Sequence, residues 1–339
     1  MEIRKNVSLK NYNTFGIAAN ARFFCEIGTV EELRQALGLR EHPEKIILGG
    51  GSNMLIVKDI EALVIHIGMK GIQVVEENGE TAVIKAMAGE NWHTLVLWTL
   101  EQGYGGLENL SLIPGNTGTA PVQNIGAYGV ELKDVLESCQ AMDTETLEIR
   151  TFNKEECRFG YRDSFFKNEG KGKYIIFSVT LKLSKKNHRI QTSYGSIENE
   201  LKNNGIQNPT IKDISEAVIS IRKSKLPDPK VLGNSGSFFK NPVLGKKKFD
   251  VFIKDHPDAP FYKVTEKEFK IPAGWLIEQC GFKGKRSGDA GVHKNQALVL
   301  VNYGNATGSE IMDLATSIQK SVLKKFQIHI SPEVNIIDL

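Results

Sequence analysis

The order of apolar and polar residues predicts both helices and strands along the chain. Helices are expected in residues 29–39, 91–102, 213–225, 272–281 and 307–326. Thr29 with Glu32, and Thr307 with Glu310, have the spacing of a capping box, in which each side chain bonds to the backbone of the other residue. Two of the helices are therefore expected to begin beside Thr29 and Thr307.

Shorter apolar or alternating runs predict strands in residues 46–48, 54–57, 81–88, 135–142, 174–183, 297–301 and 334–337. Strands and helices do not alternate strictly, which indicates an α+β fold. The length of 339 residues corresponds to two or three domains. The basic segment 184–189 and the Asn-, Gly- and Pro-rich segment 203–209 bracket the expected boundary.

One long stretch, residues 111–129, has neither pattern and is rich in Gly, Pro, Asn and Thr. A loop of this length inside a compact domain is usually either functional or disordered. Apolar residues interleaved within it, such as Ile113, Val122 and Ile125, favour a functional loop.

Composition narrows the choice of ligand. The net charge of +3 is too small for a surface that binds nucleic acid or a membrane, so the expected partner is a small molecule. The four cysteines form no Cys-x-x-Cys pair and the seven histidines are scattered, so neither a metal site nor a disulfide framework is expected. With reduced thiols and no signal-like or membrane-spanning apolar run, a cytoplasmic protein is predicted.

The glycine triplet Gly49, Gly50 and Gly51, followed by Ser52 and Asn53, joins two predicted strands. There is no Gly-x-Gly-x-x-Gly fingerprint and no Lys-Ser/Thr after the glycines, which excludes a Rossmann site and a P-loop. Bare backbone amides in such a turn can still bind a diphosphate. A plain tight turn explains the triplet equally well.

Three further segments combine glycine with polar groups. Residues 113–129 carry four glycines with amide and hydroxyl donors between them, so the backbone can approach a flat polar ligand closely. Residues 157–164 place Arg162 beside an aromatic residue, as either a carboxylate receptor or a surface ion pair. Ser237, in the Gly- and Phe-rich residues 233–242, lies outside any Gly-x-Ser-x-Gly motif, which disfavours a hydrolase nucleophile.

In this order and at these separations, the four segments resemble the UDP-N-acetylenolpyruvoylglucosamine reductases of bacterial peptidoglycan synthesis, the MurB family, in its type I branch. Two strings are highly specific to that family, Lys-Leu-Pro-Asp-Pro at 225–229 and Gly-Ser-Phe-Phe-Lys-Asn-Pro at 236–242. The match runs from Asn-Thr-Phe-Gly at 13–16 to Pro-Glu-Val at 332–334, essentially the whole chain. It favours the functional interpretation of each segment.

The resemblance implies a two-subdomain FAD-binding module of the vanillyl-alcohol-oxidase or PCMH type, followed by a substrate-binding α+β domain. The implied bounds are residues 1–70, 71–204 and 205–327, with residues from about 328 to 339 expected to return to the first subdomain. The implied FAD contacts are Gly49, Gly50, Gly51, Ser52, Asn53, Pro114, Gly115, Gly118, Gln123, Asn124, Ile125, Gly126 and Ala127.

Three residues match the family's catalytic positions, namely Arg162, Ser237 and Glu333. The substrate is an enol ether conjugated to a carboxylate, so hydride addition builds negative charge on the carboxylate. Arg162 is expected to hold that charge with a bidentate fork. Ser237 is expected to deliver the proton to the adjacent carbon, and Glu333 to orient or stabilise the enol form.

The resemblance also implies substrate contacts, because a diphosphate and a sugar require cations and amides. They are Tyr161, Tyr194, Lys225, Asn241 and Gln296, and Tyr194 resembles the tyrosine that closes over the substrate in the type I branch. NADPH is implied as the reductant of the flavin, using the same cleft in turn with UDP-N-acetylglucosamine enolpyruvate. A monomer is expected.

Two alternative functions are considered. One is another FAD-dependent oxidoreductase of the superfamily that acts on a sugar or an alcohol. The absence of His or Cys in the regions usually used for covalent flavin attachment disfavours it. The other is a non-catalytic nucleotide-sugar binding protein, which would have no need to keep Arg162, Ser237 and Glu333 together.

Overall fold

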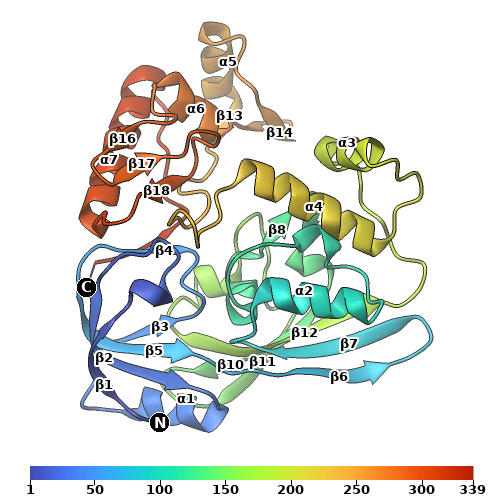
Figure 1. Ribbon diagram of the computed structural model, residues 1–339, viewed down its shortest axis with the longest axis vertical. Helices are drawn as coiled ribbons and strands as arrows, with labels where there is room; N and C mark the ends of the chain where they lie inside the picture. Colours follow the sequence, from blue (N-terminus) through green and yellow to red (C-terminus); the bar gives the residue numbers. More distant parts are fainter. Residues whose placement is uncertain (339) are drawn as a thin grey trace. The chain divides into compact units, whose positions relative to one another are not determined.

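The computed structural model describes residues 1–338, and its elements are shown in Figure 1. The chain divides into two compact units, each built from segments far apart in sequence. The first unit contains residues 1–7, 21–50 and 61–224. The second contains residues 8–20, 51–60 and the chain from residue 225 onward. In the described part of the chain, no helix is long and apolar enough to cross a membrane.

Two sheets of four and five strands form the framework of the first unit. The smaller one has the strand order β1 (Arg4–Ser8), β2 (Asn20–Ile27), β5 (Ile60–Ile67) and β3 (Lys45–Leu48). The apolar face of helix α1 (Val30–Gly38) packs on it in one buried cluster. Half of the predicted capping box is present, because the Thr29 hydroxyl accepts a hydrogen bond of 3.1 Å from the Glu32 N–H. The Glu32 carboxylate accepts the N–H of Gly28, at 2.7 Å, in place of that of Thr29.

The larger sheet is antiparallel, in the order β11 (Ile149–Asn153), β10 (Leu136–Asp143), β12 (Tyr174–Ser184), β7 (Thr81–Met87) and β6 (Ile72–Glu77). Burial alternates only at the end of β12, where Leu181 and Leu183 are buried and Lys182 between them is exposed; residues 175–179 are buried on both faces of the sheet. Helix α2 (Trp92–Glu101) packs against this sheet in the largest apolar cluster of the unit.

The segment predicted to be irregular, residues 111–129, contains η3 (Thr117–Thr119), η4 (Pro121–Gln123) and β8 (Gly126–Ala127), which pairs with β9 (Val130–Glu131). Backbone hydrogen bonds fasten it to the end of β7. The Thr117 N–H donates to the Glu90 carbonyl at 2.8 Å, and the Gly118 N–H donates to the Ala88 carbonyl at 3.0 Å. The loop therefore has a defined structure, anchored on the sheet.

Two helices complete the first unit, α3 (Gly195–Asn203) and α4 (Ile211–Lys225). They pack together through a small apolar cluster that includes Ile197 and Val218. The same cluster receives the ring of Tyr128 from the long loop. Helix α4 is thus tied to the loop that carries several predicted site residues.

The second unit begins with β4 (Met54–Ile56), which pairs in parallel with β19 (Asn335–Ile337). It has two three-stranded sheets, β13 (Val243–Gly245), β15 (Glu268–Lys270) and β14 (Tyr262–Thr265), and β16 (Arg286–Ser287), β17 (Ala290–Val292) and β18 (Leu300–Asn302). Its helices are α5 (Lys246–Asp255), α6 (Ala273–Gln279) and α7 (Gly308–Phe326). The predicted capping box opens α7, with both the Thr307 and the Glu310 bonds present.

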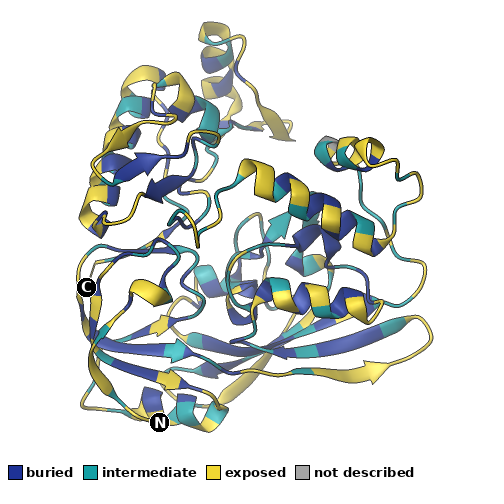
Figure 2. Ribbon diagram, in the orientation of Figure 1, coloured by how far each residue is buried: buried dark blue, intermediate teal, exposed yellow. Residues whose placement is uncertain are grey.

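Several elements were not predicted, among them the largely buried β2 and β17, and two others in which burial is weak. Strand β6 was not predicted, because it is an edge strand with five of its six residues exposed (Figure 2). Helix α5 was also missed, since it opens with three lysines. The strand predicted at 297–301 begins only at Leu300, because the Gln296 carbonyl accepts the Val299 N–H and closes a turn.

Candidate active site

Two predicted cofactor segments meet inside the first unit. A Cβ added to Gly50 would lie 2.8 Å from Asn116 Oδ1 and 3.0 Å from the Cα of Gly115. A Cβ added to Gly49 would lie 2.8 Å from the Thr119 side chain. Glycine is required at Gly50, because there the loop packs against the backbone of Gly115 and Asn116, whereas at Gly49 the contact is with the Thr119 side chain.

Where the two glycine loops meet, backbone N–H groups are left that can donate hydrogen bonds to an anionic ligand. Within the described residues, the backbone N–H groups of Gly50 and Gly115 have no hydrogen-bond acceptor. Unpaired amides in closely packed glycine loops form an anion-binding concavity, which fits the phosphates of a dinucleotide. The remaining members of the predicted set, Gly51, Ser52 and Asn53, belong to the second unit.

Asn124 holds the end of the loop in place. Its side-chain amide donates to Glu131 Oε2 at 3.1 Å and to the Gly160 carbonyl at 3.0 Å, and its Oδ1 accepts the Lys133 N–H at 3.0 Å. The residue is fully buried and adopts a left-handed conformation (φ 45°). Asn124 therefore acts as a structural link between the loop and the turn that follows Gly160.

That turn presents Arg162. The turn is closed by reciprocal backbone hydrogen bonds between Gly160 and Asp163. Arg162 lies in the left-handed region (φ 53°), which is strained for a non-glycine residue and typical of functional sites. Its Nη2 donates to the Gly126 carbonyl at 2.7 Å, and its guanidinium carbon lies 6.0 Å from the centre of the Tyr161 ring.

Two tyrosines contact each other at the long loop of residues 111–129, Tyr128 on the loop itself and Tyr194 just before α3. Tyr194 precedes the first turn of α3, is 53% exposed, and its ring centre lies 5.6 Å from that of Tyr128. Burial raises the pKa of Tyr128, so its phenol is neutral. Gln123, Ile125 and Ala127 lie on the same loop, and Ile125 is buried in the core beneath it.

In the second unit, Ser237 and Glu333 lie on neighbouring segments. The Glu333 N–H donates to the Phe238 carbonyl at 2.8 Å, and Ser237 forms an isolated bridge with Val299. Phe238 is fully buried and anchors the segment, whereas Ser237 is exposed. Asn53 joins this group, because its side-chain amide reaches the Glu333 carbonyl at 3.5 Å.

Two predicted substrate residues meet at the first turn of α6. Asn241 Oδ1 accepts the Ala273 N–H at 2.9 Å and so caps the helix. Gln296 Oε1 lies 3.4 Å from where a Cβ on Gly274 would be. Lys225 is the last residue of α4 and is exposed.

The predicted set is thus distributed over both units. The first unit brings together Gly49, Gly50, the Pro114–Ala127 loop and Arg162. The second unit brings together Asn53, Ser237 and Glu333, and separately Asn241 and Gln296.

The sequence analysis missed Arg222, on α4. Its Nε is buried without a hydrogen-bond partner, and burial, with a smaller contribution from the charge of Arg162, lowers the pKa of Arg222. The sequence carried one signal for this residue. Arg222 follows Ile214 and Val218 at helical spacing, so it is a charged residue on the buried, mostly apolar side of α4.

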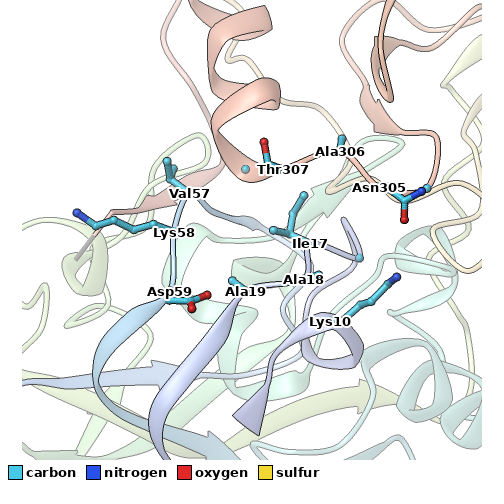
Figure 3. Close-up of a pocket in the computed structure, with 13 residues that line it drawn as sticks. Lys10, Ile17, Ala18, Ala19, Val57, Lys58, Asp59, Asn305, Ala306 and Thr307 are labelled. Carbon is cyan, nitrogen blue, oxygen red and sulfur yellow. The ribbon is translucent and has the colours of Figure 1, made fainter. Parts of the chain in front are cut away.

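A pocket of about 260 Å³ lies elsewhere in the second unit, beside the first turn of α7 (Figure 3). Its lining includes Lys10, Lys58 and Asp59, and none of the predicted site residues. The helix end there is already capped, because Glu310 accepts the Thr307 N–H at 2.7 Å. The pocket therefore adds nothing to the candidate site.

Comparisons with known proteins cover nearly the whole chain. Residues 21–151 match the family model of a FAD binding domain, and residues 228–337 match that of the UDP-N-acetylenolpyruvoylglucosamine reductase C-terminal domain. The chain is 60% identical to the UDP-N-acetylenolpyruvoylglucosamine reductase of Flavobacterium johnsoniae, over 99% of this chain and 100% of the relative. It is 48% identical to the enzyme of that name from Pseudomonas fluorescens strain Pf0-1, over 99% of each.

A solved structure also shows similarity to a UDP-N-acetylenolpyruvylglucosamine reductase. The crystal structure of UDP-N-acetylenolpyruvylglucosamine reductase from Thermus caldophilus is similar, with a TM-score of 0.68 and 25% identity. The similarity covers 99% of this chain and 100% of that chain.

Proposed function

The chain belongs to the UDP-N-acetylenolpyruvoylglucosamine reductase family, and on that premise we propose how its residues divide the reaction. The fold is a FAD-binding module followed by a substrate-binding α+β domain. The activity is the FAD-dependent, NADPH-driven reduction of the enolpyruvyl group of UDP-N-acetylglucosamine enolpyruvate, a step of peptidoglycan precursor synthesis. The roles of individual side chains in cofactor binding, substrate binding and catalysis are proposed below.

We propose that the glycine loops hold the pyrophosphate of FAD through the amides of Gly50 and Gly115. The close packing of the loops and the unpaired amides support this assignment. When bound, FAD supplies the hydride for the substrate double bond. The full set of proposed contacts is Gly49, Gly50, Gly51, Ser52, Asn53, Pro114, Gly115, Gly118, Gln123, Asn124, Ile125, Gly126 and Ala127.

Arg162 binds the substrate carboxylate in this proposal. The hydrogen bond from its Nη2 to the Gly126 carbonyl fixes the plane of the guanidinium on the loop that contacts the cofactor. Hydride addition to the methylene carbon moves negative charge onto the carboxylate oxygens. A preoriented guanidinium stabilises that charge more in the transition state than in the ground state.

Ser237 donates the proton that completes the reduction, and Glu333 stabilises the enol form. The exposed Ser237 hydroxyl is available to a ligand, and the Glu333 N–H bond to Phe238 holds the carboxyl-bearing residue on the adjacent segment. This hydrogen bond is the observation on which the catalytic assignment rests. A hydroxyl suffices as an acid here because a carbanion-like intermediate is a strong base.

Lys225, Asn241 and Gln296 are proposed to bind the diphosphate and sugar, and Tyr161 and Tyr194 to cover the substrate. The meeting of Asn241 and Gln296 at α6 supports this grouping.

We also propose the bounds 1–70, 71–204 and 205–327 for the two FAD subdomains and the substrate domain. The parallel pairing of β19 with β4, a strand within residues 1–70, supports the return of the C-terminal segment to that stretch of sequence, and both strands belong to the second compact unit.

The protein is further proposed to be a cytoplasmic monomer. Its four cysteines are all free thiols, as expected in a reducing compartment.

The experiment that tests the function is anaerobic reduction by NADPH followed by addition of the enolpyruvyl substrate. Bleaching of the flavin by NADPH and its return with the substrate support the proposal. A flavin that is reduced but not reoxidised by the substrate would overturn it.

A further inference from the structure

Ser164 lies two residues after Arg162 and is almost completely buried. It occupies the N-cap position of the short helix η6 (Phe165–Lys167), where a serine side chain usually accepts a hydrogen bond from the helix backbone. Within the described structure, its hydroxyl makes no such capping bond. It donates instead to the carbonyl of Val122, at 2.6 Å. The side chain is therefore engaged by a different segment and not by the helix that follows it.

That segment is the long loop that carries the proposed FAD contacts. Val122 lies in the helical turn η4 (Pro121–Gln123) of this loop. The last carbonyls of a helical turn have no partner within the turn, so a donor from outside stabilises it. Ser164 supplies that donor from the segment of Arg162, which ties the arginine to the loop.

The turn that presents Arg162 is joined to the loop on both of its sides. The Asn124 amide donates to the Gly160 carbonyl at 3.0 Å, before the arginine in sequence, and Ser164 holds the chain after it. Between these two points, Arg162 Nη2 donates to the Gly126 carbonyl at 2.7 Å. The backbone on each side of Arg162 and the guanidinium itself are thus all held by the same loop.

Ser164 is itself held firmly by the residues after it. The side chain of Phe166 is buried, and its ring centre lies 5.0 Å from that of the buried Phe152. The Asn168 amide donates to the Ser164 carbonyl at 3.1 Å and to Asp163 Oδ1 at 3.0 Å. The Ser164 hydroxyl therefore connects a backbone fixed by the core with the loop.

Arg162 requires such support because its backbone lies in the left-handed region, with φ 53°. A non-glycine residue keeps that strained conformation only where the surrounding structure holds it. The Asn124 and Ser164 bonds provide this hold on the two sides of the turn. Without the Ser164 bond, the turn is tied at one side only and can relax, which moves the guanidinium.

We propose that Ser164 is a positioning residue that holds Arg162 in the orientation in which it binds the substrate carboxylate. This inference rests on the proposed function, in which Arg162 stabilises the charge that develops on that carboxylate. A preoriented group acts only in its correct place, and a displacement of about 1 Å can lower a rate about 100-fold. Ser164 has no need to touch the substrate, because its buried hydroxyl is engaged by the Val122 carbonyl.

The test is a double-mutant cycle of Ser164→Ala and Arg162→Lys in the FAD-loaded protein, followed by anaerobic stopped-flow absorbance. Ser164→Ala is expected to slow reoxidation by UDP-N-acetylglucosamine enolpyruvate about 10- to 100-fold. Flavin reduction by NADPH is expected to be unchanged, because NADPH has no carboxylate for Arg162 to hold. In the Arg162→Lys background, Ser164→Ala should slow reoxidation by less than about 2-fold more, because the group that it positions is already gone.

Ser178→Ala is the matched control. Ser178 is also fully buried in the first unit, and its hydroxyl donates to Gln140 Oε1 at 3.2 Å in the larger sheet. Both alanine variants lose one buried hydroxyl hydrogen bond, so a similar decrease in Tm is expected. Only Ser164→Ala should slow reoxidation. Ser164→Cys keeps a weaker donor of similar size, and its rate is expected to lie between those of Ser164→Ala and the wild type.

Losses that add in the double variant would overturn the positioning role alone, because Ser164 would then act independently of Arg162. A lower Tm of Ser164→Ala with reoxidation at the wild-type rate would overturn it as well, since Ser164 would then serve only the fold. If Ser164→Ala does not fold, Ser164→Cys replaces it in the cycle, with a smaller loss expected and the same non-additivity. Wild-type reoxidation in Arg162→Lys would contradict the proposed function, and the positioning role would fall with it.

Discussion

The backbone N–H of Glu333 donates a 2.8 Å hydrogen bond to the carbonyl of Phe238, the residue that follows Ser237. Segments almost a hundred residues apart in sequence are thereby joined, and two of the three proposed catalytic residues belong to one substructure. A change at Ser237 should consequently affect the chemistry without affecting the cofactor loops of the other unit.

Ser237→Ala is expected to leave flavin reduction by NADPH intact and to slow reoxidation by the enolpyruvyl substrate at least about 100-fold, because the proton donor is lost. Anaerobic stopped-flow absorbance measures both half-reactions. Ser235→Ala is the matched control, since that buried hydroxyl donates to the Met54 carbonyl at 3.0 Å. It should lower stability by about 1 kcal/mol with little effect on the reoxidation rate. Reoxidation at the wild-type rate in Ser237→Ala would remove this residue from the mechanism.

Gly50→Ala is expected to weaken FAD binding. Its new Cβ meets Asn116 Oδ1 at 2.8 Å and Gly115 Cα at 3.0 Å, so the two loops must separate at a cost of about 1–3 kcal/mol. Gly79→Ala is the control, because a Cβ there meets nothing within 4 Å. The flavin-to-protein ratio after purification and the FAD dissociation constant measure the effect. Full FAD occupancy in Gly50→Ala would contradict the cradle described here.

Arg162→Lys is expected to lower the rate of reoxidation by the substrate about 100-fold, although the positive charge is kept. A lysine cannot form a planar fork, and the hydrogen bond to the Gly126 carbonyl that orients the group would be lost. Measurement of the two half-reactions separately shows where the loss occurs. A variant with unchanged reoxidation would show that charge alone suffices.

Stability is expected to fall as the pH drops below about 6.5, partly because of His93. Burial, followed by the charges of Arg222 and Lys223, lowers the pKa of His93 in the folded state, while its Nδ1 accepts the Leu112 N–H at 3.0 Å. The unfolded state then binds the proton more readily, so acid favours unfolding. His93→Asn should reduce the slope of Tm between about pH 8 and pH 5.5, since its amide oxygen can replace Nδ1 without being protonated. His329→Asn, at an exposed position, should keep the wild-type slope.

The local signals in the sequence predicted local structure well. The capping box at Thr307 was confirmed in full and that at Thr29 in half, because short-range hydrogen bonds determine them. The strand at β12 was also confirmed, with alternating burial at its C-terminal end. The edge strand β6 lacks an apolar pattern, so no such signal could reveal it. Helix α5 does carry one, because Phe249 and Phe252 lie three residues apart and are both buried, and the prediction missed it beside three lysines.

In the candidate site, too, features with a local sequence signal could be predicted and features without one could not. Residue type singled out the glycine loops, and the close backbone contact at Gly50 needs a glycine, while their role toward FAD stays a prediction. Arg222 was not singled out, because a single arginine on a helix carries no motif and becomes visible only through its buried, unpaired Nε. The pairing of β19 with β4 connects distant segments and also lies beyond any local pattern.

The visible spectrum of the purified protein tests the central claim most directly. We predict bound FAD whose absorbance is bleached by NADPH under anaerobic conditions and restored by UDP-N-acetylglucosamine enolpyruvate. A colourless protein that cannot be reconstituted with FAD, or a reduced flavin that this substrate leaves bleached, would contradict it.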